Sequence, residues 1–158
     1  GVIPPPSPEW MRFLSEPHAV ECEDGRIVVM IRCRVKAAHD TSFLHQSESL
    51  DGGRTWSVAR PTAVWGYPPH LLRRRNGTLL LSFGHRREPF GERAVLSADG
   101  GRTWDVAGAF QLASAPNADL GYPTSVELED GSLYTVFYQC ERAGELPCLM
   151  AAHWRIED

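Results

Sequence analysis

The chain repeats one unit about three times, and this repeat limits the folds that it can adopt. Each copy has an apolar run, an Asp-Gly or Asn-Gly pair, and a second apolar run rich in Val, Ile and Leu. These dipeptides tolerate the positive φ angles that a tight hairpin turn requires. The turn glycines are Gly25, Gly77 and Gly131, which gives spacings of 52 and 54 residues. We therefore expect each unit to begin with a β-hairpin.

A second repeat, with the pattern Ser-x-Asp-x-Gly-x-Thr-Trp, occurs twice at an offset of 48 residues. Its members are Ser49, Asp51, Gly53, Thr55 and Trp56, and then Ser97, Asp99, Gly101, Thr103 and Trp104. Aspartates in such a turn accept hydrogen bonds from nearby backbone amides, and the glycines supply left-handed conformations. The tryptophans are placed to cover each turn from one side. We interpret both octets as structural turns and not as sources of a catalytic acid.

The order strand, hairpin, strand, octet, strand gives about four short strands per repeat and leaves no room for a long helix. This order is typical of a β-propeller blade. We predict an all-β chain that forms one domain over residues 1–158, with blades at about 11–60, 61–110 and 111–158. The third blade lacks the octet. Propellers have about 4–8 blades, so three blades do not close a ring.

Charge and cysteine content exclude several classes of protein. The chain has 16 Lys and Arg against 20 Asp and Glu, a net charge of −4, whereas nucleic-acid binding relies on a basic face. No stretch approaches the roughly 20 apolar residues of a membrane-spanning helix. The cysteines and histidines show no metal-ligand spacing, so we expect no metal or cofactor. Cys140 and Cys148 either face each other across a hairpin or pack as free thiols, like the other two cysteines.

The octet resembles the Asp-box, or BNR repeat, of sialidases and their relatives, which are six-bladed propellers that remove terminal sialic acid. The resemblance extends to residues 65–72, 93–104 and 119–126. It covers nearly all of this chain but only about half of a family member. It implies that the chain corresponds to the C-terminal half of a six-bladed sialidase, and that its ligand is an acidic sugar or glycan.

The resemblance also implies roles for individual residues. Glu16 matches the carboxylate that activates the nucleophile, because it opens the pattern Glu-Pro-x-x-Val-Glu-x-x-Asp-Gly. Tyr122 matches the nucleophilic tyrosine, and Arg32 matches an arginine that binds the substrate carboxylate. A further arginine of that cluster is expected before the second octet, where both Arg86 and Arg93 fit.

The repeat gives an independent reason to group some of these residues. Counting back nine positions from each turn glycine leads to Glu16, Pro68 and Tyr122, and a proline follows each of them. Equivalent positions of successive blades lie on one ring around the propeller axis. We therefore expect Glu16 and Tyr122 at the same end of the central channel. His70, two residues beyond Pro68, is a further candidate to contact the substrate there.

Sialic acid carries a carboxylate at its anomeric carbon, which repels a carboxylate nucleophile; sialidases use tyrosine instead. Glu16 would serve as the base for the phenol, and the arginines would pair with the substrate carboxylate. The family's first arginine and its acid/base aspartate come from N-terminal blades, and neither Asp40 nor Asp119 matches that aspartate.

Two functions therefore compete. One is a sialidase-like glycoside hydrolase that is complete only as a homodimer closing a six-bladed ring, as part of a longer chain (the first residue is Gly1, not Met), or with a partner half. The other is a non-catalytic half-propeller that binds a glycan and lacks the acid/base.

Overall fold

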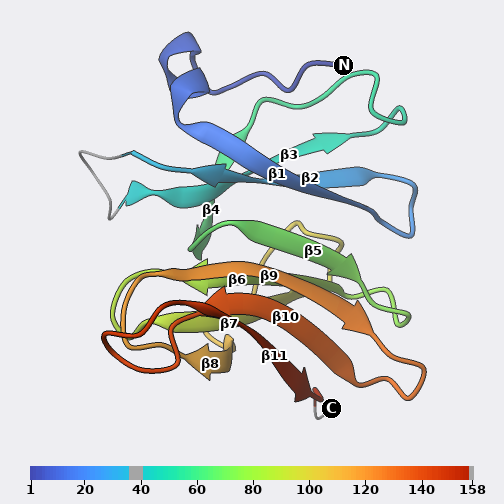
Figure 1. Cartoon of the computed structure of the whole chain (residues 1–158). Helices are drawn as coiled ribbons and strands as arrows, with labels where there is room; N and C mark the ends of the chain where they lie inside the picture. Colours follow the sequence, from blue (N-terminus) through green and yellow to red (C-terminus); the bar gives the residue numbers. More distant parts are fainter. Residues whose placement is uncertain (36–40, 157–158) are drawn as a thin grey trace.

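A computed structural model describes residues 1–35 and 41–156. Three antiparallel sheets follow one another along the chain, as Figure 1 shows. The first contains β1 (Leu14–Glu21), β2 (Ile27–Cys33), β3 (Phe43–Ser49) and β4 (Arg60–Trp65). The second contains β5 (Pro69–Arg73), β6 (Leu79–His85), β7 (Gly91–Ser97) and β8 (Phe110–Ser114). The third contains β9 (Leu120–Glu127), β10 (Leu133–Gln139) and β11 (Cys148–Trp154), and a short 3-10 helix, η1 (Pro8–Arg12), precedes β1.

The hairpin turns between the first two strands of each sheet have the backbone that the sequence requires. Gly25, Gly77 and Gly131 have φ angles of 79°, 85° and 80°, a left-handed region in which glycine carries no steric penalty. Within each sheet, consecutive strands are neighbours. The chain therefore builds each sheet as a meander, which is how a propeller blade forms.

The sheets pack face to face through two apolar layers. Val28 and Met30 of the first sheet meet Leu79 and Leu81 of the second in one buried cluster. A second cluster joins Leu80 and Ala94 to Leu133 of the third sheet, together with partly buried residues that include Trp154. Because successive side chains of a strand point to opposite faces, β6 contributes to both layers. The prediction of an all-β half-propeller is thus confirmed.

The third sheet differs from the expected pattern of four strands per blade, because it has three strands in the part of the chain that the structure describes. In the first two sheets, an octet turn connects the third strand to the fourth. Between the start of β9 and the end of β11 the sequence contains no such octet.

Both octets form closed turns around their aspartates. Asp51 accepts hydrogen bonds from the amide and the hydroxyl of Thr55, at 2.8 and 2.6 Å, and from the Ser49 hydroxyl at 2.9 Å. The hydrogen bonds from Thr55 lower the pKa of Asp51 to about 2. Asp99 accepts the equivalent bonds from Thr103 and Ser97.

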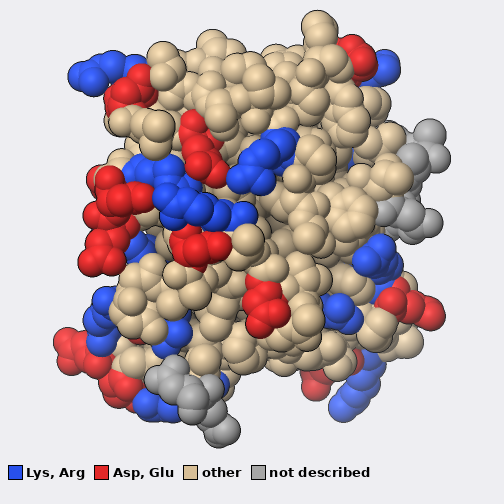
Figure 2. Space-filling model, turned by 180° about the vertical axis from the view of Figure 1, so that it is seen from behind, with Lys and Arg blue, Asp and Glu red and all other residues tan. Residues whose placement is uncertain are grey.

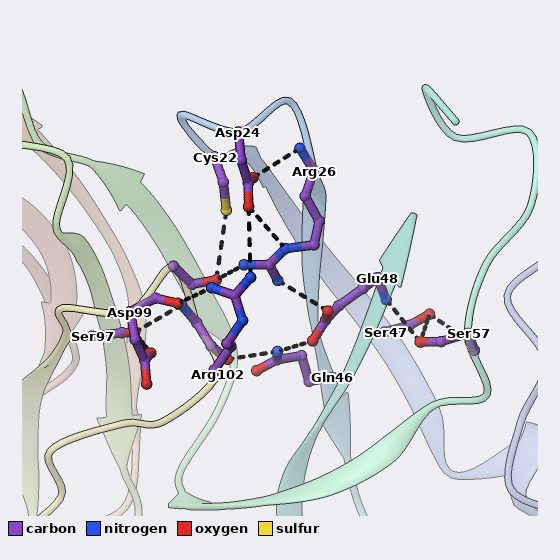
Figure 3. A network of polar contacts seen from close by, with 12 residues as sticks. Cys22, Asp24, Arg26, Gln46, Ser47, Glu48, Ser57, Ser97, Asp99 and Arg102 are labelled. Atoms are coloured by element: carbon purple, nitrogen blue, oxygen red, sulfur yellow. Dashed lines mark hydrogen bonds and ion pairs between the residues drawn. The ribbon is translucent and has the colours of Figure 1, made fainter. Parts of the chain in front are cut away.

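The second octet also joins two blades, as Figure 3 shows. The Gly100 carbonyl accepts hydrogen bonds from Arg26 Nη2 at 2.5 Å and from the Cys22 thiol. Gln46 Nε2 donates to the Gly101 carbonyl at 2.8 Å, and Trp104 Nε1 donates to Gln46 Oε1 at 2.9 Å. The turn between β7 and β8 is therefore held against the β1–β2 hairpin turn and against β3 of the preceding sheet.

The two outer flanks of the stack differ. On the first sheet, Val29, Ile31 and Ala59 form a buried cluster, and Ile3 of the N-terminal segment packs against it together with Leu14, Ile27 and Trp56. On the third sheet, alternate residues of each strand point outward, and no segment within residues 1–35 and 41–156 covers them. The outward apolar side chains are Tyr122, Val126, Tyr134, Val136 and Leu149, all of them exposed. We call these five residues the open face.

The four cysteines are free thiols. Cys148 pairs with Gln139 in the ladder, and Cys140 is buried while Cys148 is exposed, so the two do not face each other. Among residues 1–35 and 41–156, no helix is long and apolar enough to cross a membrane, and no side-chain cluster has the composition of a metal site. Figure 2 shows acidic and basic side chains interspersed on the rear face, without a continuous basic area.

Candidate active site

The first strands of the three sheets lie side by side, and their starting residues enclose a small cavity. β1 contacts β5, and β5 contacts β9. The cavity has a volume of about 200 Å³ and is lined by equivalent triplets of the three sheets, residues 16–18, 68–70 and 122–124. The repeat count thus corresponds to a real ring of positions around one end of the stack.

The backbone at two of these positions has an uncommon conformation. Glu16 has φ 48° and Tyr122 has φ 54°, and they are the non-glycine residues with positive φ in the described chain. A left-handed conformation of a residue other than glycine costs free energy, and such residues cluster at functional sites. The β1 ladder also shifts register between Ser15 and His18. Glu16 and Tyr122 therefore leave the regular strand geometry at equivalent places.

The side chains of these two residues meet. Tyr122 Oη donates a hydrogen bond to Glu16 Oε1 at 3.0 Å. Arg32 Nη1 donates to the same oxygen at 2.6 Å, from β2, where Arg32 is only 7% exposed. Glu16 Oε2 and Arg32 Nε are buried and have no hydrogen-bond partner. The ion pair is thus formed by one hydrogen bond only, so the Arg32 guanidinium keeps N–H donors that a ligand could use.

Burial by itself would raise the pKa of Glu16. The hydrogen bonds from Arg32 and Tyr122, with the charges of Arg32 and Arg86, outweigh burial and lower this pKa below its ordinary value. Glu16 is therefore a carboxylate at neutral pH, and its Oε1 atom accepts the hydrogen bond from the Tyr122 hydroxyl.

A second arginine reaches the same region. The Arg32 and Arg86 guanidinium carbons lie 4.6 and 5.4 Å from the centre of the Tyr67 ring. Arg86 Nη2 donates to the Tyr138 hydroxyl at 3.3 Å, and the Tyr138 and Tyr122 rings are 6.0 Å apart. Two cations therefore lie on one aromatic ring beside the Tyr122–Glu16 pair, an arrangement suited to a carboxylate ligand.

Gly121 makes room for Arg86. A Cβ atom at this position would lie 2.9 Å from Arg86 Nη2. Glu92 on β7 is fully buried close to Arg86, and burial raises its pKa to about 8 even though the Arg86 charge and the Gly121 amide act in the opposite direction. At neutral pH Glu92 is protonated, and the positive charge of Arg86 remains available.

The structure brings together Glu16, Arg32, Arg86 and Tyr122 of the residues that the sequence suggested. Arg93 points elsewhere, into a cleft with His85 and Arg87. The sequence reasoning missed Tyr67, Tyr138 and Glu92. Tyr67 immediately precedes the ring position Pro68, which was a usable signal. Nothing in the sequence identifies Tyr138 or Glu92 as neighbours of Arg86.

His70 lines the cavity, but its Nδ1 atom already accepts a hydrogen bond from the Ser125 amide at 3.4 Å. His18, its equivalent, accepts from the Leu71 amide at 3.1 Å, and the two rings are 4.2 Å apart. Each histidine thus links one blade to the next. Asp119 lies near Tyr138, whose pKa is raised first by burial and then by Asp119. Asp40 lies outside the described residues.

Comparisons with known proteins agree with this architecture. A family model described as a BNR repeat-like domain matches residues 11–135. Among curated proteins, no sequence matches the chain.

Three solved structures illustrate the likeness in fold. A protein of unknown function from Dyadobacter fermentans is 26% identical, with a TM-score of 0.78, over 91% of this chain and 38% of that one. The α-L-arabinanase of Penicillium chrysogenum, complexed with arabinobiose, is 18% identical with a TM-score of 0.73, and the match covers 98% of this chain and 49% of that one. The intramolecular trans-sialidase of Ruminococcus gnavus is 20% identical with a TM-score of 0.61, and the match covers 89% of this chain and 32% of that one.

The chain spans half or less of the length of these proteins. The low identities to the arabinanase and the trans-sialidase support the fold and leave the substrate to be argued from the site. The family model, by contrast, covers most of the sequence and agrees with the resemblance seen in the octets. This chain is a member of the BNR repeat-like domain family, with the sialidase-like propeller fold.

Proposed function

We propose that this half-propeller supplies the nucleophile, its base and the anion-binding arginines of a sialidase-type glycoside hydrolase. The observation that carries the proposal is the contact of Tyr122 Oη with Glu16 Oε1 at 3.0 Å, beside the guanidinium groups of Arg32 and Arg86. Glycosidases that act on neutral sugars use carboxylates at the anomeric carbon, whereas a sugar with an anomeric carboxylate requires an uncharged nucleophile.

In the proposed reaction, Tyr122 Oη attacks the anomeric carbon while its proton passes to Glu16 Oε1. The bond from that carbon to the leaving-group oxygen breaks, and this oxygen takes a proton from a general acid on the remaining blades. In the second step, the conjugate base of that acid takes a proton from a water molecule, whose oxygen attacks the anomeric carbon. The tyrosyl–sugar bond breaks, and Tyr122 Oη takes its proton back from Glu16, so both residues return to their starting state and the sugar keeps its anomeric configuration.

The substrate carboxylate has a second effect on this chemistry. Arg32 lowers the pKa of Glu16 in the free protein. A carboxylate that takes over part of the Arg32 guanidinium weakens that interaction and makes Glu16 a stronger base. Substrate binding would therefore activate the Tyr122–Glu16 pair at the moment when it is needed.

The site also favours an acidic sugar over a neutral one. A neutral ligand, such as the arabinobiose bound by the Penicillium arabinanase, would leave the Arg86 charge without a partner anion. A carboxylate in the cavity would accept hydrogen bonds from both guanidinium groups. Charge-assisted bonds of this kind are about twice as strong as neutral ones.

The ring must be completed for hydrolysis. The open face leaves Val136 at 46% and Leu149 at 90% exposure, and exposed apolar sheet faces mark interaction surfaces. We propose that further blades cover it, either from a second copy in a homodimer or from the remaining half of a longer protein. The general acid would lie on those blades.

An aryl sialoside tests the function. We expect the closed assembly to release the aryl group, and Tyr122→Phe to remove that activity while the sugar still binds. No turnover by an assembly of proven mass would refute the hydrolase.

A binding module without catalysis is the second candidate. It is favoured by one observation: no described carboxylate other than Glu16 lines the cavity. This version predicts millimolar binding of sialic acid without hydrolysis, and it fails if Arg32→Ala leaves that binding unchanged.

A further inference from the structure

A second basic cleft lies between the first and second sheets, separate from the cavity that contains Tyr122. It has a volume of about 80 Å³, and its lining includes Trp65, His85, Arg87 and Arg93. We infer that this cleft binds a small oxyanion, such as a sulfate ester or a carboxylate. The inference does not depend on hydrolysis in the first site.

The contacts in the cleft define the protonation state of its histidine. The Pro89 carbonyl accepts a hydrogen bond from Arg93 Nη2 at 3.2 Å and lies 3.1 Å from His85 Nδ1. A carbonyl oxygen can only accept, so His85 carries its proton on Nδ1. His85 Nε2 is then the acceptor for Arg87 Nε, at 3.4 Å. The imidazole is therefore neutral, and it does not offset the positive charges of Arg87 and Arg93.

The two arginines of the cleft lack the carboxylate partners that the buried arginines of this protein have. Arg26 pairs with Glu48, Arg32 with Glu16, and Arg74 with Glu127. Over residues 1–35 and 41–156, no carboxylate forms an ion pair with Arg87 or Arg93. Arg93 Nε is buried and has no hydrogen-bond partner. The cleft therefore concentrates two positive charges without compensation.

The electrostatics of the neighbouring groups agree with this geometry. Burial lowers the pKa of Arg93, and the charge of Arg87 lowers it further. Burial, Arg93 and Arg87 together lower the pKa of His85. The Arg87 guanidinium lies 4.3 Å from the centre of the Trp65 ring. Because Arg87 Nε donates to His85, the two terminal NH2 groups of Arg87 are the donors that would bind an anion. An oxyanion between the two arginines would relieve their repulsion.

The cleft lies next to the first site. The rings of Trp65 and Tyr67 are 5.7 Å apart, and Tyr67 is the ring on which Arg32 and Arg86 lie. A glycan with a second anionic substituent is therefore one source of the oxyanion, and a free anion is the other.

His85 provides a readout that is specific for this cleft. We would follow its imidazole signals by NMR through a pH titration, with and without inorganic sulfate. The Arg86→Gln variant removes an arginine of the first site and serves as the background. We expect sulfate to raise the pKa of His85 in this background, because the anion offsets the charges of Arg87 and Arg93.

The Arg87→Gln/Arg93→Gln double variant should abolish the sulfate-dependent shift. Arg87→Gln alone, at an exposed side chain, should weaken sulfate binding about tenfold, the loss of roughly 1.4 kcal/mol, and it guards against misfolding of the double variant. The proposal would be overturned if sulfate left the pKa of His85 unchanged, or if sulfate raised that pKa equally in the double variant. Glucose 6-sulfate that binds at least tenfold tighter than sulfate identifies a glycan as the source; equal affinity identifies the free anion.

Discussion

The hydroxyl of Tyr122 and the carboxylate of Glu16 form a hydrogen bond of 3.0 Å although 106 positions separate them in the chain. Both residues have positive φ, and both precede a proline at the start of the first strand of a sheet. The contact joins the first sheet to the third across the axis. It therefore depends on the correct stacking of all three sheets.

Removing the charge of Glu16 tests its role as a base. Glu16→Gln keeps the shape of the side chain but cannot accept the Tyr122 proton, so we expect kcat/KM for an aryl sialoside to fall by about 10²–10⁴. Sialic acid should still bind, because the Glu16 carboxylate no longer competes with the substrate carboxylate for Arg32. Glu21→Gln, at the far end of β1, is the matched control and should keep the wild-type rate. Equal rates for wild type and Glu16→Gln would remove Glu16 from the mechanism.

Gln46 tests the link between the second octet and the first sheet. It is fully buried, and its amide contacts both the Gly101 carbonyl and Trp104 Nε1. Gln46→Leu leaves both groups without a partner, and we expect it to lower the free energy of unfolding by about 2–4 kcal/mol. Gln111→Leu, at an exposed position of β8, should change it by less than about 0.5 kcal/mol. Chemical denaturation measures the free energy of unfolding of both variants. Equal values for Gln46→Leu and Gln111→Leu would show that the contacts of the second octet contribute little to blade packing.

The histidine pair makes stability depend on pH. Burial, with the neighbouring His18, lowers the pKa of His70 to about 4, compared with about 6.5 in the unfolded chain. As the pH falls from about 6.5 to about 4, the unfolded state takes up a proton that the folded state resists, and stability is lost. His70→Asn keeps an acceptor for the Ser125 amide but does not titrate.

We therefore expect the free energy of unfolding of His70→Asn to fall less than that of wild type between pH 7 and 4.5. His153→Asn, on β11 and outside the channel, should follow wild type. Identical slopes for wild type and His70→Asn would show that the pair is not protonated on unfolding in this range.

The open face predicts assembly in solution. Val136 lies at its centre, opposite Thr124 and Ala151 in the ladders of the third sheet. We expect wild type to have twice the chain mass of 17.6 kDa by light scattering, and Val136→Glu to have the mass of one chain. Val58→Glu, at an exposed position between the first octet and β4, is the matched control for added charge. A wild-type protein of single mass would rule out the homodimer and leave a partner half.

Sequence reasoning could predict the candidate site only to the extent that the repeat encodes it. Glu16 and Tyr122 could be predicted together because both stand nine residues before a turn glycine. The same count led to Pro68 and passed over Tyr67, whose ring supports Arg32 and Arg86. Repeat position fixes where the backbone lies, but the partners of a side chain depend on packing between blades.

The choice between Arg86 and Arg93 shows the same limit. Both precede the second octet, and both fit the family pattern. Arg93 lies within β7, on the face opposite to Glu92, whereas Arg86 follows the end of β6 and lies against Gly121. Only the three-dimensional arrangement separates the arginine of the Tyr122 site from the arginine of the second cleft.

The most direct test of the central claim is to identify the residue that bonds to the sugar. The closed assembly would be treated with a fluorinated sialosyl fluoride, which slows hydrolysis of a covalent intermediate, and digested for mass spectrometry. We predict a sugar adduct on the peptide that contains Tyr122 and none in Tyr122→Phe. An adduct on Glu16 or Asp119, or turnover of an aryl sialoside without any adduct on Tyr122, would contradict the account.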